Sequence, residues 1–234
     1  MAHCLYQLKQ QIGYRFKARH YKGFGIHSPY LYHLITSELQ GKHPYYSFER
    51  IESVRKELNI NQNKKEVHCG QIIFRIIQDA QFMTLLELGT NRGMETQYMA
   101  MANQKARCIS VTNSAELAVQ AQKGFQKQGL NHIDLQLLKP QEKLTGIINQ
   151  LDKLDFVLFN QLNGAQECLD LFHQCLLRKN DGSIFVFMDI HENGDKTKAW
   201  KNILSNHDVQ VTIDLYHLGI VLFKPELEKR NYVI

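Results

Sequence analysis

The chain contains no apolar run long enough to cross a membrane, and residues 1–11 lack the apolar core of a signal peptide. Its five cysteines are odd in number and include no Cys-x-x-Cys pair, a pattern that favours neither zinc binding nor a disulfide framework. We therefore expect reduced thiols and a cytoplasmic protein. At 234 residues, the chain can bury one full core. The cysteines are Cys4, Cys69, Cys108, Cys168 and Cys175.

Acidic residues are absent before Glu38, whereas the rest of the chain carries 23 basic and 23 acidic residues. The net charge of +5 is therefore a property of the N-terminal segment, where the cations alternate with aromatic rings. Such a segment can bind nucleic acid through phosphate contacts and stacking, or it can pack its rings against the domain surface. Five cations are few for a nucleic-acid site, so packing is the favoured interpretation. The cations are Lys9, Arg15, Lys17, Arg19 and Lys22, and the aromatics are Tyr6, Tyr14, Phe16, Tyr21 and Phe24.

One glycine-containing turn organises the remaining pattern. A short apolar run over residues 84–88 contains Glu87 and is followed by Gly89, Thr90 and Gly93, after which a helical pattern covers residues 94–102. Gly89 permits a tight turn, and Gly93 permits the close approach of a ligand or a helix. The free N–H groups at the start of such a helix favour a polar or negative group. A glycine pair alone is weak evidence, because many strand-to-helix turns contain glycine.

The segment before this turn is predicted to be helical. Ser28 suits a helix N-cap and Pro29 the first helical position, with the helix running over residues 29–39. Ser47 is expected to cap a second helix that ends near residue 59. A polar loop over residues 61–65 then precedes a third helix over residues 67–79. We expect residues 1–80 to form a helical extension that covers one side of a ligand cleft, and residues 81–234 to form the main domain.

From residue 84 onward, strands and helices alternate, which predicts a parallel sheet covered by helices on both faces. The last two strands, over residues 209–215 and 220–223, are joined by only four residues and must form an antiparallel hairpin. The other expected strands cover residues 106–112, 133–137, 155–159 and 183–188. The other expected helices cover residues 114–128, 141–149, 165–177 and 197–204, the first of them capped by Ser114.

Together these motifs resemble class I S-adenosylmethionine (SAM)-dependent methyltransferases, and more narrowly a small bacterial subfamily that opens with a His-Ser-Pro segment. The resemblance implies a Rossmann-like α/β sheet with a terminal antiparallel hairpin. It extends from Gly25 to the C-terminus. The residues that carry it are Gly25 to Tyr30, Leu86 to Thr90 with Gly93, Asp189 to His191 with Trp200, and Val211 to Leu215 running into Gly219 to Val221.

The resemblance implies SAM as cofactor and S-adenosylhomocysteine (SAH) as product. Glu87, Gly89, Thr90 and Gly93 match the motif that holds the methionine part of SAM in the family. Thr112 and Asn113 stand where the family usually has an acid that binds the ribose, and Asn160 stands where the family has an aspartate facing the reacting centre. Magnesium in related O-methyltransferases is held by acids after the fourth and fifth strands, where this chain has Asn160 and the pair Met188-Asp189, and one aspartate with amides makes a poor magnesium site. We expect no bound metal.

Asp189 and His191 follow the fifth strand of the alternating series, and they are the candidate base and its orienter, with His27 from the N-terminal segment as a third candidate. Structural roles in caps and loops are an equally good explanation of these residues. The sequence therefore predicts a metal-independent methyltransferase whose methyl acceptor is open. The alternative is a degenerate relative that acts as a protein-interaction or regulatory module, and nucleic-acid binding through the N-terminal segment is less favoured. No membrane partner is expected, and the terminal hairpin offers an edge for oligomerisation.

Overall fold

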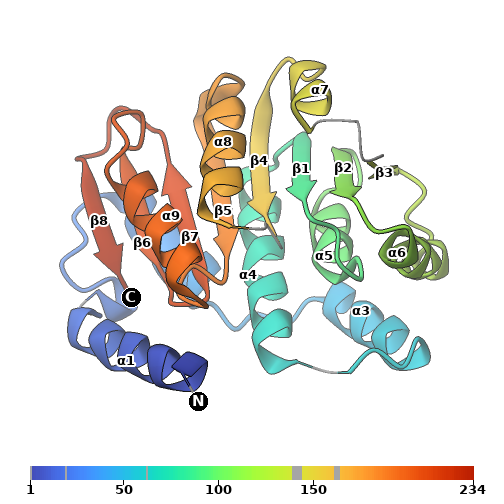
Figure 1. The fold of residues 1–234 in the computed structure, drawn as a ribbon, viewed down its shortest axis with the longest axis horizontal. Helices are drawn as coiled ribbons and strands as arrows, with labels where there is room; N and C mark the ends of the chain where they lie inside the picture. Colours follow the sequence, from blue (N-terminus) through green and yellow to red (C-terminus); the bar gives the residue numbers. More distant parts are fainter. Residues whose placement is uncertain (1, 19, 62, 139–143, 161–163) are drawn as a thin grey trace.

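The computed structural model describes residues 2–18, 20–61, 63–138, 144–160 and 164–234. Within these residues, an eight-stranded sheet lies between two layers of helices (Figure 1). The strands are β1 (Thr84–Leu88), β2 (Arg107–Thr112), β3 (Ile133–Leu137), β4 (Leu154–Phe159), β5 (Lys179–Met188), β6 (Val211–Asp214), β7 (Leu218–Leu222) and β8 (Arg230–Val233). The α-helices are α1 (Ala2–Lys17), α2 (Pro29–His33), α3 (Tyr46–Glu57), α4 (Lys64–Ala80), α5 (Met94–Ala102), α6 (Ala115–Gln128), α7 (Leu144–Asn149), α8 (Ala165–Leu176) and α9 (Gly194–Leu204).

The sheet has the strand order β3-β2-β1-β4-β5-β7-β6-β8. Strands β1 to β5 pair in parallel, β7 pairs antiparallel with both β5 and β6, and β8 adds a parallel edge strand to β6. The predicted α/β fold with a parallel sheet and a terminal antiparallel hairpin is therefore confirmed. The chain order reverses direction across the sheet between β1 and β4, which is where open sheets of this kind bind ligands.

Several predicted elements have different boundaries in the structure. Ser47 does not cap the second helix, because α3 begins one residue earlier and Tyr45 occupies the N-cap position. In the hairpin, β6 begins two residues later and ends one residue earlier than predicted, whereas β7 begins two residues earlier and ends one residue earlier. Strand β8 was not predicted at all, and the predicted start of the helix over residues 141–149 lies outside the described residues.

The N-terminal helices α2, α3 and α4 are part of one packed layer of the domain. Their buried side chains share a core with α5, α6 and one face of the sheet, while a second core lies between the other face and α7, α8 and α9. Gly70 of α4 shows how close this packing is, since a Cβ there would lie 2.3 Å from the ring of Tyr98 in α5. Ser28 caps α2 as predicted, accepting a hydrogen bond from the backbone N–H of Leu31.

Helix α1 lies against the hairpin end of the sheet, next to β6 and β8 (Figure 1). The Tyr6 hydroxyl donates to Thr197 Oγ1 at 2.8 Å, and the Tyr14 hydroxyl donates to the carbonyl of Ile234. These contacts support the packing interpretation for two of the aromatic residues in the basic segment. Phe16 and Phe24, in contrast, remain 77% and 79% exposed.

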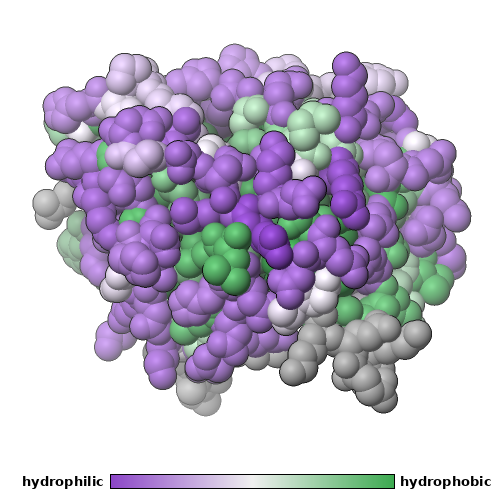
Figure 2. All heavy atoms as spheres, turned by 90° about the horizontal axis from the view of Figure 1, so that it is seen from above, coloured by the Kyte–Doolittle hydropathy of each residue, from purple (hydrophilic) through white to green (hydrophobic). Residues whose placement is uncertain are grey.

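Figure 2 shows the molecule from above the view of Figure 1, with a mainly hydrophilic surface broken by small hydrophobic areas. This is the edge of the sheet at the amino ends of the parallel strands, since β1 and β4 point away from it in Figure 1. Among the described residues, no helix is both long and apolar enough to span a membrane.

Candidate cofactor cleft

The carboxyl group of Glu87, near the end of β1, is completely buried inside a network of hydroxyl groups. Ser110 donates to it at 2.6 Å and Thr96 donates to the same oxygen. Thr90 does not reach into solvent, because its hydroxyl lies 2.7 Å from Ser110 Oγ. Burial, with the nearby charge of Glu95, raises the pKa of Glu87 to about 8. This hydrogen-bond network holds the turn after β1 in place from its buried side.

The turn itself adopts the left-handed backbone that its sequence predicts. Gly89, Asn91 and Gly93 have φ angles of 106°, 50° and 73°. A Cβ at Gly93 would lie 2.8 Å from both the Cβ of Ala121 and the ring of Phe125, so this glycine permits the close packing of α5 on α6. Gly93 therefore has a structural role in the close approach of two helices, and its predicted contact with a cofactor stays a prediction.

A cleft of ≈ 630 Å³ opens beside this turn, at the carboxyl ends of the parallel strands. It receives residues that directly follow β1, β2, β4 and β5, together with the start of α4 and the loop before α9. The lining is mainly polar, so it offers hydrogen-bonding groups to a polar ligand. The lining residues are Lys65, Glu66, Asn91, Glu95, Asn113, Asn160, Gly164, Met188, Asp189, Glu192, Asn193 and Lys196.

The two residues at the predicted ribose position, Thr112 and Asn113, have different roles in the structure. The Thr112 hydroxyl accepts a hydrogen bond from the backbone N–H of Ser114 and is almost buried. Ser114, not Asn113, caps α6 by accepting from the N–H of Leu117. The exposed Asn113 side chain thus lines the cleft without a capping role.

Asn160 and Met188 occupy the ends of β4 and β5 inside the cleft. Asn160 Nδ2 donates to Glu87 Oε1 at 3.5 Å, a long hydrogen bond. Neither side chain carries a charge, so Asp189 supplies the only carboxylate from these two strand ends among the described residues. Magnesium prefers several hard oxygen ligands, and this pair of strand ends fits it poorly.

Asp189 lies at the wall of the cleft in an ion pair that joins distant parts of the chain. Lys65 Nζ, from the first turn of α4, lies 2.8 Å and 3.0 Å from the two carboxylate oxygens. His217 Nδ1 is 3.8 Å from the same carboxylate, and the backbone of Asp189 is left-handed with φ 56°. Burial alone would lower the pKa of Lys65, but the hydrogen bond and the charge of Asp189 reverse this effect and raise it.

His191 is not paired with Asp189, contrary to the predicted base-and-orienter arrangement. Its Nε2 lies 2.7 Å from Asp214 Oδ2, at the end of β6, and its Nδ1 is buried without a hydrogen-bond partner in the described structure. Asp189 and His191 do line a common smaller cavity of ≈ 80 Å³ between α1 and the hairpin. The two predicted residues are therefore neighbours that belong to separate pairs.

The structure does not bring His27 to the cleft. Its side chain is exposed and does not line the cleft. Tyr30, three residues later, lies beneath Lys224 Nζ at 4.8 Å, just beyond the end of β7. Because β7 runs antiparallel to β5, this end lies at the opposite edge of the sheet from the cleft.

Glu95 and Lys65 are among the cleft residues that the sequence motifs did not indicate. Glu95 lies in the first turn of α5, only 4% exposed, and burial with the nearby charge of Glu66 raises its pKa to about 7. An acid two residues after the glycine turn was a visible signal for a cleft residue. Lys65 gave no signal, because its position opposite Asp189 depends on how α4 crosses the sheet.

No known family model matches the chain, and no curated protein matches it either. Solved structures do match. An O-methyltransferase from Bacillus cereus in complex with SAH has a TM-score of 0.58 at 14% identity, covering 77% of this chain and 92% of its own. The O-methyltransferase TomG from Streptomyces achromogenes, in complex with SAM, has a TM-score of 0.58 at 13% identity, covering 77% of this chain and 91% of its own. The SAH-bound methyltransferase PaMTH1 from Podospora anserina has a TM-score of 0.61 at 11% identity, covering 79% and 91%.

The chain therefore has the fold of the class I SAM-dependent methyltransferases. Its similarity to solved O-methyltransferases confirms, at the level of the fold, the resemblance that the sequence motifs predicted. Identities of 11–14% carry the comparison no further than the architecture.

Proposed function

We propose that this protein is a SAM-dependent methyltransferase that uses no metal ion in its cleft. The observation that carries the proposal is the left-handed glycine turn after β1, which borders a large polar cleft at the carboxyl ends of the strands. The neighbouring structures named above bind SAM or SAH, and the same class of cofactor fits a cleft in this position.

In this proposal, the backbone of the turn from Gly89 to Gly93 contacts the methionine part of the cofactor, and Asn113 hydrogen-bonds a ribose hydroxyl. An amide makes a weaker bond there than a carboxylate would. Because its own carboxyl is buried, Glu87 acts indirectly, by holding the side chains of Thr96 and Asn160 through hydrogen bonds. Glu95 faces the cleft with a buried carboxyl that a positively charged cofactor would keep ionised.

Methyl transfer from a sulfonium is an in-line displacement, so positioning of the two reactants supplies most of the rate. A base is needed only where the acceptor loses a proton. Asp189 lies at the wall shared by the cleft and the smaller cavity under α1, which suits it to receive that proton while Lys65 fixes its carboxylate. The acceptor would reach it from the side of α1 and the hairpin.

Calorimetric titration of the full-length protein with SAM and with SAH tests the proposal. We expect micromolar binding of both ligands, lowered at least tenfold by Gly89→Val, which forces a β-branched residue into a backbone with φ 106°. Gly129→Val is the matched control, because Gly129 also has a positive φ and open space around it but caps α6 away from the cleft. Equal affinities in the wild type and Gly89→Val would contradict the proposed cofactor position.

The residues at the ends of β2, β4 and β5 favour a second candidate function, that of a protein-interaction module. Thr112, Asn160 and Met188 replace acids with neutral side chains, as expected of a degenerate relative that serves as a protein-interaction module. Absence of binding at millimolar SAM would reject the enzyme and favour this module.

Nucleic-acid binding rests on the exposed Phe16 and Phe24 and on the cations around them. It predicts RNA binding with a shallow salt dependence that is lost on deleting residues 1–24. If the full-length protein shows no salt-dependent binding to RNA, this interpretation fails.

A further inference from the structure

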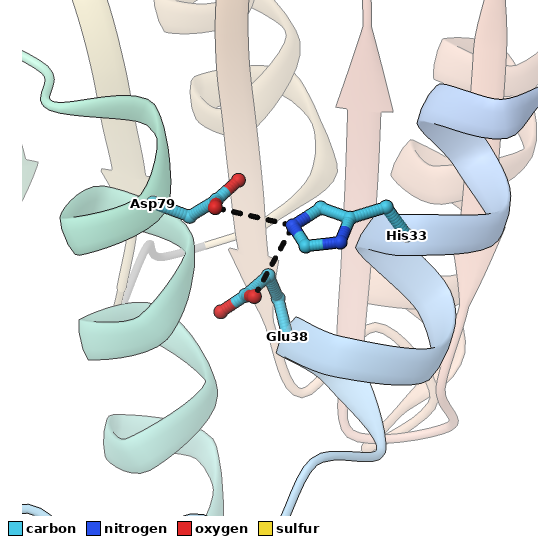
Figure 3. Close-up of side chains that lie close together, drawn as sticks. All are labelled: His33, Glu38 and Asp79. Atoms are coloured by element: carbon cyan, nitrogen blue, oxygen red, sulfur yellow. Dashed lines mark hydrogen bonds and ion pairs between the residues drawn. The ribbon is translucent and has the colours of Figure 1, made fainter.

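Three potential metal ligands meet at the edge of the sheet opposite the cleft (Figure 3). His33 Nε2 lies 3.1 Å from Asp79 Oδ1 and 3.6 Å from Glu38 Oε1. Asp79 comes from the last turn of α4, and His33 and Glu38 come from the segment that contains α2. Since Lys65 at the other end of α4 lines the cleft, the cluster is separate from the proposed cofactor site.

The two ligands on the N-terminal segment are aligned by an unusual helix. Residues Leu34–Leu39 continue α2 as a π-helix, in which the Gln40 N–H donates to the carbonyl of Ile35, five residues earlier, at 3.1 Å. Residues five apart face different directions in an α-helix but similar directions in a π-helix. The π-helix therefore places Glu38 on the same side as His33, where both face Asp79 (Figure 3).

The negative charge of this cluster is only partly compensated by the protein. Arg75 lies close, but its Nε donates to the backbone carbonyl of Glu38 at 2.6 Å, and no Lys or Arg is within ion-pair distance of either carboxylate in the described structure. A cation between the two carboxylates would supply the missing charge.

We propose that His33, Glu38 and Asp79 bind a zinc ion. Zn²⁺ takes imidazole nitrogen and carboxylate oxygen at about 2.0–2.2 Å, so tetrahedral ligand atoms lie about 3.3 Å apart. The distances of 3.1 Å and 3.6 Å from His33 Nε2 bracket this value before any ion is bound. A water molecule would complete the coordination, since the His33 and Asp79 side chains are about half exposed. The bound ion would join the N-terminal segment to the end of α4.

The test is titration of the metal-free, full-length protein with Zn²⁺ at neutral pH, followed by calorimetry and by thermal unfolding. We expect one equivalent of Zn²⁺ to bind and to raise the melting temperature, whereas Mg²⁺ does neither because it prefers all-oxygen octahedral sites. His33→Ala and Asp79→Asn should each lower the Zn²⁺ affinity at least tenfold. His207→Ala is the matched control, because Asp208, at 3.3 Å, is the only acid that pairs with His207 within the described part of the chain, so this variant should bind Zn²⁺ as the wild type does.

Absence of Zn²⁺ binding, or unchanged binding and unchanged thermal shift in both variants, would overturn the proposal and leave the cluster as an ion pair of His33 with two acids. Asp79→Asn guards against a folding artefact, because Asp79 is half exposed and asparagine has nearly the same shape. Far-ultraviolet circular dichroism of each variant without metal confirms that the comparison is made between folded proteins.

Discussion

The two sides of the cleft are built in different ways. On the side of β1 and β2, one buried carboxyl is surrounded by neutral hydroxyls that lie within 23 residues of it along the chain. On the side of β5 and the hairpin, charges from distant segments meet, since Lys65 and Asp189 are 124 positions apart in the chain. The first side is therefore organised locally by the strand–turn–helix unit. The second side exists only after α4 and the hairpin have docked on the sheet.

The largest effect is expected from disturbing the locally organised side. Gly93→Ala should lower the free energy of unfolding by about 3 kcal/mol, because it combines a left-handed backbone with a Cβ 2.8 Å from Ala121 and Phe125. Gly129→Ala, which has a similar φ and open space, should cost only about 1 kcal/mol. Urea unfolding of both variants measures the difference, and equal costs would show that the contact with α6 is not tight.

A titration effect on the same side comes next. Because burial raises the pKa of Glu95 to about 7, the folded protein holds this proton more tightly than the unfolded chain, whose carboxyl titrates near 4.5. The contribution of Glu95 to stability is therefore complete below pH 4.5 and is lost as the pH rises through 7. Between pH 5 and pH 8, the wild type should lose up to about 3 kcal/mol relative to Glu95→Gln.

Urea unfolding of the wild type and Glu95→Gln at pH 5 and pH 8 measures this difference directly. A difference that is the same at both pH values would mean that Glu95 titrates as in an unfolded chain. In the proposed enzyme, SAM affinity should also rise as the pH passes 7, and Glu95→Gln should abolish that rise.

The side built from distant charges should respond more weakly. A double-mutant cycle with Lys65→Met and Asp189→Asn is expected to give a coupling of about 1 kcal/mol, because the pair is only partly buried. Asparagine suits the left-handed backbone at position 189, so the cycle reports the charge and not backbone strain. The exposed pair of Lys127 and Glu57 is the control, with an expected coupling below about 0.5 kcal/mol. Equal coupling energies for the two pairs would show that the Lys65–Asp189 pair is no stronger than an exposed ion pair.

The smallest effect is expected where α1 covers the second side. Tyr6→Phe removes the hydroxyl that donates to Thr197 Oγ1 at 2.8 Å and should lower the unfolding free energy by about 0.5–1 kcal/mol. Phe16→Ala serves as the comparison and should leave stability nearly unchanged, because Phe16 is 77% exposed. A larger loss for Phe16→Ala, measured by thermal unfolding, would show that α1 docks differently.

The sequence predicted the locally organised side well and the other side poorly. The bounds of β1 and α5 were predicted to the residue, because the apolar run, the glycines and the helical period all lie within one short stretch. Strand β8 was missed since Arg230 and Asn231 give it little apolar character, and it forms by pairing with β6. The partners of Asp189 and His191 could not be predicted, because no local pattern fixes which distant side chain arrives opposite them.

Helix α4 connects events at the two edges of the sheet. Its 17 residues form a rod about 25 Å long, with Lys65 at the end near the cleft and Asp79 at the far end. A rigid helix that tilts at one end is displaced at the other, so a ligand that tilts α4 at Lys65 would also move Asp79 relative to His33 and Glu38. If both sites bind as proposed and the cofactor shifts α4, cofactor and zinc will change each other's affinity by the same factor.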